Sequence, residues 1–414
     1  MTNIIFRAVY LLKEKLIQNF KDLSNYHHYK YYIESIKRRF QYLIPFKNYY
    51  KTIHYYIERS DIDIIHRKRE IPKSAGIGIT NVCNLNCIMC NIKLAKVPPG
   101  YMDPRIFEII LKELKKIRIN SVAIHTIGEP LMHKDIDQLF QIIKKNKIKI
   151  KFSTNGQLPE RLIKLIHYYS NQIEFVRFSI DAAKPKTYEF IRKGANFKKL
   201  IKSLELVHKF NQNRINFNVS VKIDSILSLT NINEIPLFFK KYGKYCKPES
   251  INFTLVNGLS PDTAYFKKAF PFPNLIKKEV PCSLPFNAVY FTNDGKVTLC
   301  CEDFNEELTV GNIKDNSLIK IWSNDYSSEI RRQHLSPETI SITACKNCYG
   351  PYKFISNITN YFIHLLYYYH PEYSNKEFGD RLIYFLHKMD KTIKNKGLHR
   401  LEQVILNIFR KEIK

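Results

Sequence analysis

The chain has 414 residues, and its 44% of hydrophobic residues exclude an intrinsically disordered protein. Its formal net charge of +28 is spread over both ends and the middle, so it favours contact with anionic surfaces but predicts no specific nucleic-acid site. No apolar run is long enough to span a membrane, and the N-terminus lacks the basic start and cleavage site of a secretory signal. We therefore expect a cytoplasmic protein, in which nine cysteines indicate metal or cluster ligation rather than disulfides.

Residues 1–73 predict a helical extension that is basic and rich in tyrosine. Apolar side chains recur at helical spacing near its start, at Ile5, Val9, Leu12, Leu16 and Phe20. Three functions fit this composition: binding a leader peptide, lying on a membrane surface, or binding RNA through stacking and phosphate contacts. A helical subdomain that only packs on the rest of the chain fits it as well.

Residues 74–258 alternate between short β-branched runs and longer amphipathic stretches, which is typical of βα units around a parallel sheet. The runs that predict strands are 75–80, 121–126, 148–154, 175–180, 215–221 and 250–256. The stretches that predict helices lie near 103–118, 135–147, 159–170, 185–210 and 231–242. In parallel α/β barrels the chemistry lies at the carboxyl ends of the strands, so polar residues there are the candidates for a site.

Cys83, Cys87 and Cys90 follow the first predicted strand with the spacing Cys-x3-Cys-x2-Cys. Three thiolates in so short a loop can surround one compact metal centre. A 4Fe–4S cluster takes four ligands, so three cysteines would leave one iron open, as a reactive site requires. The alternatives are a zinc site completed by a distant histidine and three unrelated thiols.

This spacing resembles the signature of the radical S-adenosylmethionine (SAM) superfamily. The resemblance implies that the three cysteines hold a 4Fe–4S cluster and that SAM chelates the open iron through its amino and carboxylate groups. It also implies reductive cleavage of SAM to a 5′-deoxyadenosyl radical, which abstracts a hydrogen atom from the substrate. Met89 stands at the position whose residue contacts the adenine in that family.

The later strand ends resemble the SAM-binding motifs of the same family. Ile127-Gly128-Glu129-Pro130 is similar to its Gly-Gly-Glu motif, with Ile127 in place of the first glycine, and implies that Glu129 and the backbone at Gly128 bind the SAM ammonium. Further implied SAM contacts, at the ribose and the carboxylate, are Ser153, Asn155, Ser179 and Arg192. The fifth strand offers Lys222 and Asp224 at its end. Taken one by one, these residues also fit ordinary loops, turns and a solvated arginine.

Four of the remaining cysteines lie in an irregular region, residues 259–354: Cys282, Cys300, Cys345 and Cys348. Asp294-Gly295 predicts a two-residue hairpin turn between 288–292 and 296–299, which would bring the first two of these cysteines together. Four thiolates would complete a zinc site as well as an iron–sulfur site, and the spacing alone does not decide between them.

This region resembles the SPASM domain, an auxiliary-cluster module of radical SAM enzymes. The stretch from Cys282 to Cys300, with Gly295 between them, matches its opening signature, and residues 310–323 resemble its connecting segment. The full module has seven cysteines and two clusters, whereas this chain has no cysteine after Cys348. The resemblance therefore implies the shortened, twitch-like form, with one auxiliary 4Fe–4S cluster on the four cysteines and with Cys301 able to replace Cys300.

Cys301 also stands where sulfatase-maturing relatives carry a catalytic aspartate, and Glu302 and Asp303 follow it. These three residues are the candidate catalytic groups. A carboxylate here would accept the substrate proton while the auxiliary cluster accepts an electron. The alternative is that both acids are ordinary residues at the end of a hairpin.

The predicted fold is α/β: a partial (β/α)6 TIM-like barrel over 74–258, a cysteine-rich module over 259–354, and helical extensions over 1–73 and 355–414. The predicted function is that of a radical SAM enzyme with SAM and two 4Fe–4S clusters, acting by first choice on a peptide or protein side chain. The alternatives are two-electron dehydrogenation of a small alcohol such as an aminocyclitol or sugar, lipid modification, and a non-catalytic iron–sulfur electron carrier. The expected partners are an electron donor such as flavodoxin or ferredoxin and an anionic or membrane surface facing the basic helical ends.

Overall fold

The computed structural model of the chain describes residues 71–90, 92, 95–125, 127–213, 219–255, 268–270, 272, 275, 282, 284–335, 340–346, 348, 353–396 and 401–412. Residues 1–70 lie outside this set, and with them nearly all of the predicted N-terminal extension.

The described part of the chain builds one nine-stranded sheet in the order β6-β5-β4-β3-β2-β1-β7-β8-β9. Its first six strands are β1 (Ser74–Ile77), β2 (Ser121–Ile124), β3 (Lys149–Thr154), β4 (Ile173–Ser179), β5 (Ser220–Leu227) and β6 (Ile251–Leu255). Each strand from β2 to β6 pairs in parallel with the strand before it in the chain. The predicted α/β fold, a partial barrel on a parallel sheet, is confirmed.

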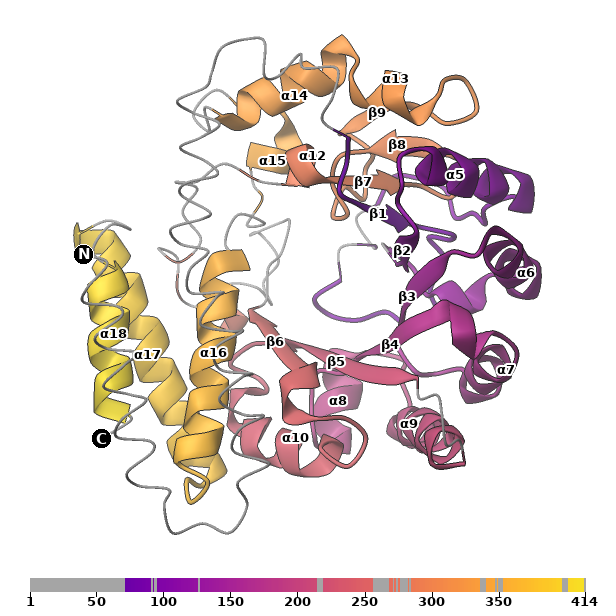
Figure 1. Cartoon of the computed structure of the whole chain (residues 1–414). Helices are drawn as coiled ribbons and strands as arrows, with labels where there is room; N and C mark the ends of the chain where they lie inside the picture. The colour runs from indigo at the N-terminus through magenta and orange to yellow at the C-terminus, as the bar shows by residue number, and fades with distance from the viewer. Residues whose placement is uncertain are drawn as a thin grey trace. The chain divides into compact units, whose positions relative to one another are not determined.

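Helices alternate with these strands and cover one side of the sheet (Figure 1). They are α5 (Pro104–Lys116), α6 (Ile136–Asn146), α7 (Pro159–Tyr169), α8 (Pro185–Ile191), α9 (Phe197–Gln212) and α10 (Ile235–Tyr242). Short 3-10 turns are η2 (Pro130–Met132), η3 (Ser170–Gln172), η4 (Ile232–Glu234) and η5 (Pro248–Ser250). The single helix expected at 185–210 is two helices, because the chain turns at Gly194, whose φ of +92° favours glycine.

The fifth strand differs from its prediction, since it runs from Ser220 to Leu227 and not over 215–221. Buried and half-buried residues alternate along this strand through Asp224. The sequence-based prediction ends the strand at residue 221 and places Asp224 beyond it. Lys222 and Asp224 therefore lie within the strand and not after its end. Residues 214–218 are outside the described set.

The predicted hairpin is confirmed as β7 (Ala288–Phe291) and β8 (Lys296–Thr298), which pair antiparallel around Gly295 at φ +87°. A third strand, β9 (Thr309–Asn312), pairs with β8. The sequence did not predict that β7 also pairs in parallel with β1, so the hairpin extends the core sheet. The contact depends on Gly76, since a Cβ there would lie 2.6 Å from the Tyr290 ring.

The short helix α12 (Leu284–Asn287) precedes this hairpin, and further helices follow it to the end of the described chain. These are α13 (Leu318–Trp322), α14 (Asp325–Leu335), α15 (Thr343–Lys346), α16 (Lys353–Tyr369), α17 (Asn375–Lys396) and α18 (Leu401–Glu412). α16 protects the edge strand β6, because Asn360 accepts from the Phe253 N–H (2.8 Å) and the His364 ring contacts the Ile251 carbonyl (3.0 Å).

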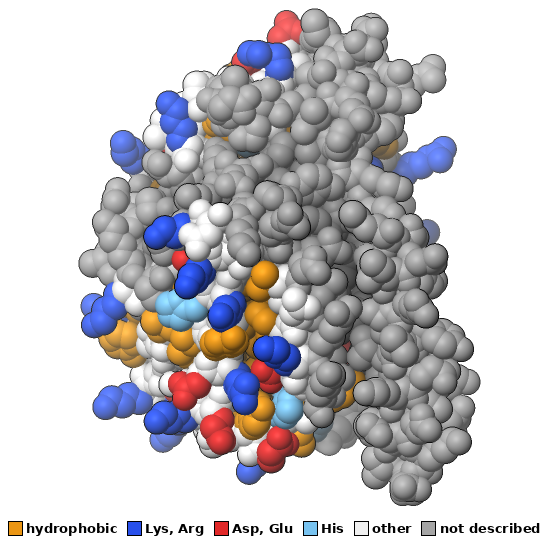
Figure 2. Space-filling model, turned by 90° about the vertical axis from the view of Figure 1, so that its left-hand side faces the viewer, with side chains coloured by type: hydrophobic (Ala, Val, Ile, Leu, Met, Phe, Trp, Pro, Cys, Tyr) orange, Lys and Arg blue, Asp and Glu red, His pale blue; other side chains and the backbone are white. Residues whose placement is uncertain are grey.

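Two surface properties bear on the expected partners. No described helix combines the length and apolar character needed to cross a bilayer. On the face shown in Figure 2, the described Lys and Arg side chains are scattered among acidic and hydrophobic ones, as the spread of charge along the sequence predicts.

Candidate active site

The cysteine loop that follows β1 is held in place by the turn between α8 and α9. The Asn86 N–H donates to the Lys193 carbonyl (2.8 Å), and the Ile88 N–H donates to the Ile191 carbonyl (2.9 Å). Inside the loop, the Leu85 N–H points at the Cys83 sulfur (3.4 Å). These bonds fix the backbone on both sides of Cys87.

The three thiols of the loop lie close enough for each ionised sulfur to disfavour the others. Cys87 is buried, Cys83 is half-buried and Cys90 is exposed. Burial raises the pKa of the Cys87 thiol to about 11, while the nearby Arg192 acts in the opposite direction. Thiolate ligation of a cationic centre would offset this cost by releasing the protons, so the donor set fits an iron–sulfur cluster.

Glu129 lies at the end of β2 with its carboxylate buried. One oxygen accepts from the Thr154 hydroxyl (2.8 Å) and the Leu131 N–H (3.2 Å), and the other accepts from the Asn155 N–H (2.7 Å). Burial raises the pKa of Glu129 to about 7, against the effect of these hydrogen bonds. The carboxylate is therefore held rigidly between the ends of β2 and β3.

Gly128 allows this loop to approach the cysteine loop. Its φ is +88°, and a Cβ would lie 2.5 Å from the Thr80 carbonyl oxygen and 2.9 Å from the Val82 carbonyl oxygen. The next residue, Glu129, donates its N–H to that Val82 carbonyl (2.9 Å). Ile127 replaces the first glycine of the family motif. Gly128, the glycine that this close backbone approach requires, is retained.

We expect Gly128→Ala to lower both SAM affinity and cluster content, because the clashing atoms are backbone and cannot move aside. The strain at positive φ adds about 1–3 kcal/mol. Thermal unfolding and iron content of the anaerobically prepared protein measure the effect. Gly311→Ala is the control, because Gly311 has an ordinary φ and the nearest atoms to its added Cβ belong to the Ile321 side chain, at 3.1 Å. Retention of iron and SAM binding in Gly128→Ala would contradict the assignment.

Asn155 links the end of β3 to the cysteine loop. Its side-chain amide donates to the Asn84 side chain (2.8 Å) and lies 3.9 Å from the Cys83 sulfur. The two predicted serines, Ser153 and Ser179, are half-buried on the inner face of the sheet, and Met89 is half-buried in the loop. Hydrogen bonds thus connect Glu129, Asn155 and the loop of Cys83 in one network.

Arg192 is buried against Asp181, with Nε and Oδ2 2.8 Å apart. The other oxygen of Asp181 accepts from the Ile226 N–H on β5 (2.7 Å). Sequence reasoning assigned no role to Asp181, although an acid directly after the fourth strand was the available signal. The pair orients the guanidinium beside Cys87.

The second cysteine group gathers around Tyr290 on β7. The charges of Cys282, Cys301 and Cys348 all act on Cys300, and the Cys301 side chain contacts both Cys300 and the Tyr290 hydroxyl. The Glu302 N–H points at the Cys300 sulfur (3.3 Å). Within the described residues, no three His, Cys, Asp or Glu side chains are arranged to hold a single metal ion.

Cys345 completes the predicted second group from α15. It is buried, and its sulfur lies 3.6 Å from Nε2 of His334, which sequence reasoning did not single out. Thiols are the donors that iron–sulfur clusters require, so this set also fits a cluster.

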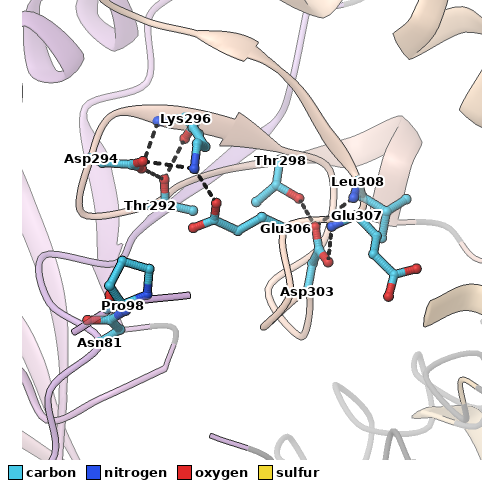
Figure 3. A network of polar contacts seen from close by, with 10 residues as sticks. All are labelled: Asn81, Pro98, Thr292, Asp294, Lys296, Thr298, Asp303, Glu306, Glu307 and Leu308. Atoms are coloured by element: carbon cyan, nitrogen blue, oxygen red, sulfur yellow. Dashed lines mark hydrogen bonds and ion pairs between the residues drawn. The ribbon is translucent and has the colours of Figure 1, made fainter. Parts of the chain in front are cut away.

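Asp303 is buried and fully engaged in shaping its own loop (Figure 3). It accepts from the Thr298 hydroxyl (2.9 Å), the Glu307 N–H (2.9 Å) and the Leu308 N–H (2.8 Å). These contacts favour the alternative reading of Asp303 as a hairpin-end acid. Glu302 is exposed and Cys301 is half-buried.

A narrow cleft, with a cavity volume of about 20 Å³, lies between the end of β1 and the β7–β8 hairpin. The core contributes Gly78, Thr80, Asn81 and Ile127 to its walls. The hairpin and the loop after it contribute Tyr290, Thr298, Cys300, Cys301, Asp303 and Glu306. The cleft has room for about one water molecule, and it brings Asn81 of the β1 loop near Cys300 and Cys301.

Comparison with known proteins gives a match for the core sheet and another for the region of the second cysteine group. Residues 77–226 match the radical SAM superfamily, and residues 282–349 match the SPASM iron-sulfur cluster-binding domain. The probable GTP 3′,8-cyclase of Methanocaldococcus jannaschii is 33% identical over 139 residues, which are 33% of this chain and 45% of that protein. The GTP 3′,8-cyclase of Aquifex aeolicus is 24% identical over 306 residues, 63% of this chain and 92% of that protein.

The chain spans about half the length of the first of these relatives. Among solved structures, Streptococcus suis SuiB bound to the precursor peptide SuiA is 18% identical with a TM-score of 0.51, over 65% of this chain and 69% of SuiB. That likeness supports the fold. The family matches imply SAM binding, a 4Fe–4S cluster and an auxiliary cluster. The chain thus carries a radical SAM domain over residues 77–226 and an SPASM-type iron–sulfur domain over residues 282–349.

Proposed function

We propose that Cys83, Cys87 and Cys90 hold the cluster at which SAM binds. The observation that carries this proposal is the network around Glu129, in which a buried carboxylate is bonded to the β3 end, and the β3 end is bonded to the cysteine loop. A rigid carboxylate beside the cluster loop is suited to an ammonium group. When bound, the cluster and SAM supply a 5′-deoxyadenosyl radical that abstracts a hydrogen atom from the substrate.

The predicted SAM-binding residues would each hold a different part of the SAM molecule. Gly128 and Glu129 would receive the ammonium, and Arg192 would face the carboxylate with the nitrogens that Asp181 does not engage. Asn155 and the two inner-face serines, Ser153 and Ser179, would lie along the ribose, with Met89 at the adenine. Each role follows the family motif at that position, and described contacts support it for Glu129, Asn155 and Arg192, which lie beside the cysteine loop.

The second group would hold the auxiliary cluster. Cys282, Cys345 and Cys348 are three of its ligands, and the fourth is Cys300, whose sulfur receives the Glu302 N–H as cluster sulfurs commonly do. Cys301 is then left at the cleft with Tyr290. Cys301 and the exposed Glu302 stay candidates for moving a substrate proton, while Asp303 is tied to its loop.

We propose a peptide or protein side chain as the substrate. The match to the SPASM domain supports this choice, together with the likeness in fold to SuiB, whose solved structure holds a precursor peptide. The reaction needs an external one-electron donor such as flavodoxin or ferredoxin.

A phosphorylated nucleoside is the second candidate. It is favoured by the sequence similarity to GTP 3′,8-cyclases and by cationic side chains on the inner face of the sheet.

Substrate-dependent 5′-deoxyadenosine formation separates the two candidates. The anaerobic holoprotein, with SAM and reductant, is incubated with peptides encoded beside its gene or with GTP. We expect the peptide to raise 5′-deoxyadenosine and to lose hydrogen, as read by mass spectrometry. Stimulation by GTP alone would replace the first candidate with the second.

A further inference from the structure

Side chains on the inner face of β3, β4 and β5 carry an excess of positive charge. Alternate residues of these strands are buried under the helices, which leaves Lys151, Arg177, Lys222 and Asp224 half-buried on the opposite face. The strand register places Arg177 next to Lys222 and places Asp224 next to Ser179. The four groups therefore lie on adjoining strands within neighbouring layers of the same face.

The charges on this face do not cancel. Arg177 pairs with Asp224, with Nε and Oδ2 3.0 Å apart and side chains that are 31% and 34% exposed. The Lys222 ammonium lies 4.0 Å above the centre of the Phe175 ring. Among the described residues, neither Lys222 nor Lys151 forms an ion pair with a carboxylate. Three cations thus outnumber the two carboxylates whose charges act on Lys222, namely Asp224 and the exposed Glu174.

This excess has an energetic cost that an anion would remove. Burial, and then the charges of Arg177 and Lys151, lower the pKa of Lys222, whereas the charges of Asp224 and Glu174 act the other way. Like charges in a partly desolvated site repel more strongly than in water. The Phe175 ring offsets part of this cost, typically about 0.5–2 kcal/mol, without neutralising the charge.

The position of the group suits a substrate contact. Arg177 precedes Ser179 by two residues on β4, so it lies about 6–7 Å farther into the sheet than the serine assigned to SAM. An anionic group bound there would place the atoms next to it beneath the SAM site. Arg177 and Lys222 thus lie one layer of side chains below the proposed SAM site, and they are not among the residues assigned to SAM.

We propose that Lys222 and Arg177, with Lys151 beside them, bind an oxyanion of the substrate, either a phosphate or a carboxylate. This inference deepens the proposed function and rests on it for the identity of the substrate. A phosphate would come from a nucleotide, and a carboxylate from an acidic residue next to the modified side chain. Arginine and lysine both recognise these groups through charge-assisted hydrogen bonds.

Calorimetric titration of the anaerobic holoprotein, loaded with SAM, tests the proposal. The two probes are inorganic pyrophosphate and the blocked tripeptide acetyl-Gly-Glu-Gly-amide. We expect one probe to bind and Lys222→Gln to weaken it about tenfold or more, with Lys198→Gln, an exposed helix lysine, as the charge-matched control. The double variant Arg177→Gln/Asp224→Asn, which keeps the net charge, should weaken the same probe.

The two probes distinguish the source of the oxyanion. Binding of pyrophosphate would indicate a phosphate, and binding of the tripeptide would indicate a carboxylate. Failure of both probes to bind, or equal affinity in Lys222→Gln and Lys198→Gln, would overturn the proposal. Iron content of every variant shows that the protein is intact. 5′-Deoxyadenosine formed in the wild type without substrate reports separately on the proposed function, so the two failures are distinguishable.

Discussion

Replacing Cys87 by serine is expected to abolish 5′-deoxyadenosine formation, a fall of at least about a thousandfold and to the background of the assay. Cys87 is the buried member of the loop, and backbone bonds fix the residues on either side of it. A serine hydroxyl has almost the same shape, but it is a poor ligand for a cluster that thiolates hold. Product analysis after anaerobic reconstitution, with SAM and dithionite, measures the loss.

Cys246→Ser is the matched control for this variant. Cys246 is half-buried, its sulfur lies 3.9 Å from the Tyr242 carbonyl, and burial raises its pKa to about 12. It lies outside both cysteine groups, so the control should keep its full iron content and activity. Product formation by Cys87→Ser at the parental rate would refute the ligand assignment.

Glu129→Gln is expected to weaken SAM binding at least tenfold, by about 1.4 kcal/mol or more. The amide removes the charge, and its NH2 group must face a donor, because the two carboxylate oxygens together accept three hydrogen bonds. Leaving such a buried donor unsatisfied costs about 1–3 kcal/mol in addition. Equilibrium dialysis with labelled SAM measures the affinity.

The control for this variant is Glu108→Gln, which removes an exposed acid from α5 that pairs with Lys112 and Lys145. Iron content should be unchanged in both proteins, since Glu129 is not assigned as a ligand. Wild-type SAM affinity in Glu129→Gln would show that the ammonium binds elsewhere.

Local patterns carried most of the fold prediction. Five of the six core strands lie close to their expected places, because short runs with β-branched residues separate the longer amphipathic stretches. The fifth failed because its charges lie on the inner face of a partial barrel, where a strand can carry Lys222 and Asp224 without ending. The pairing of β7 with β1 leaves no local signal, since it joins strands far apart in the chain.

The candidate site was predictable where a motif is contiguous and less so where it depends on tertiary contacts. The spacing of the cysteines and the family resemblance together were enough to predict the cysteine loop, Gly128 and Glu129 as site residues. The Asp181–Arg192 pair and the contact of His334 with Cys345 join separate segments, so only the fold shows them. The hydrogen bonds that tie Asp303 to its loop are likewise invisible in the sequence.

The most direct test of two thiolate-held clusters is iron and sulfide content, with electron paramagnetic resonance, on the anaerobically reconstituted parent and on Cys345→Ala/Cys348→Ala. Two cube-type clusters predict about eight irons per chain, falling to about four in the double variant with the SAM-responsive signal retained. About four irons in both proteins, with zinc in the parent alone, would contradict the auxiliary-cluster assignment and make the second cysteine group a structural zinc site.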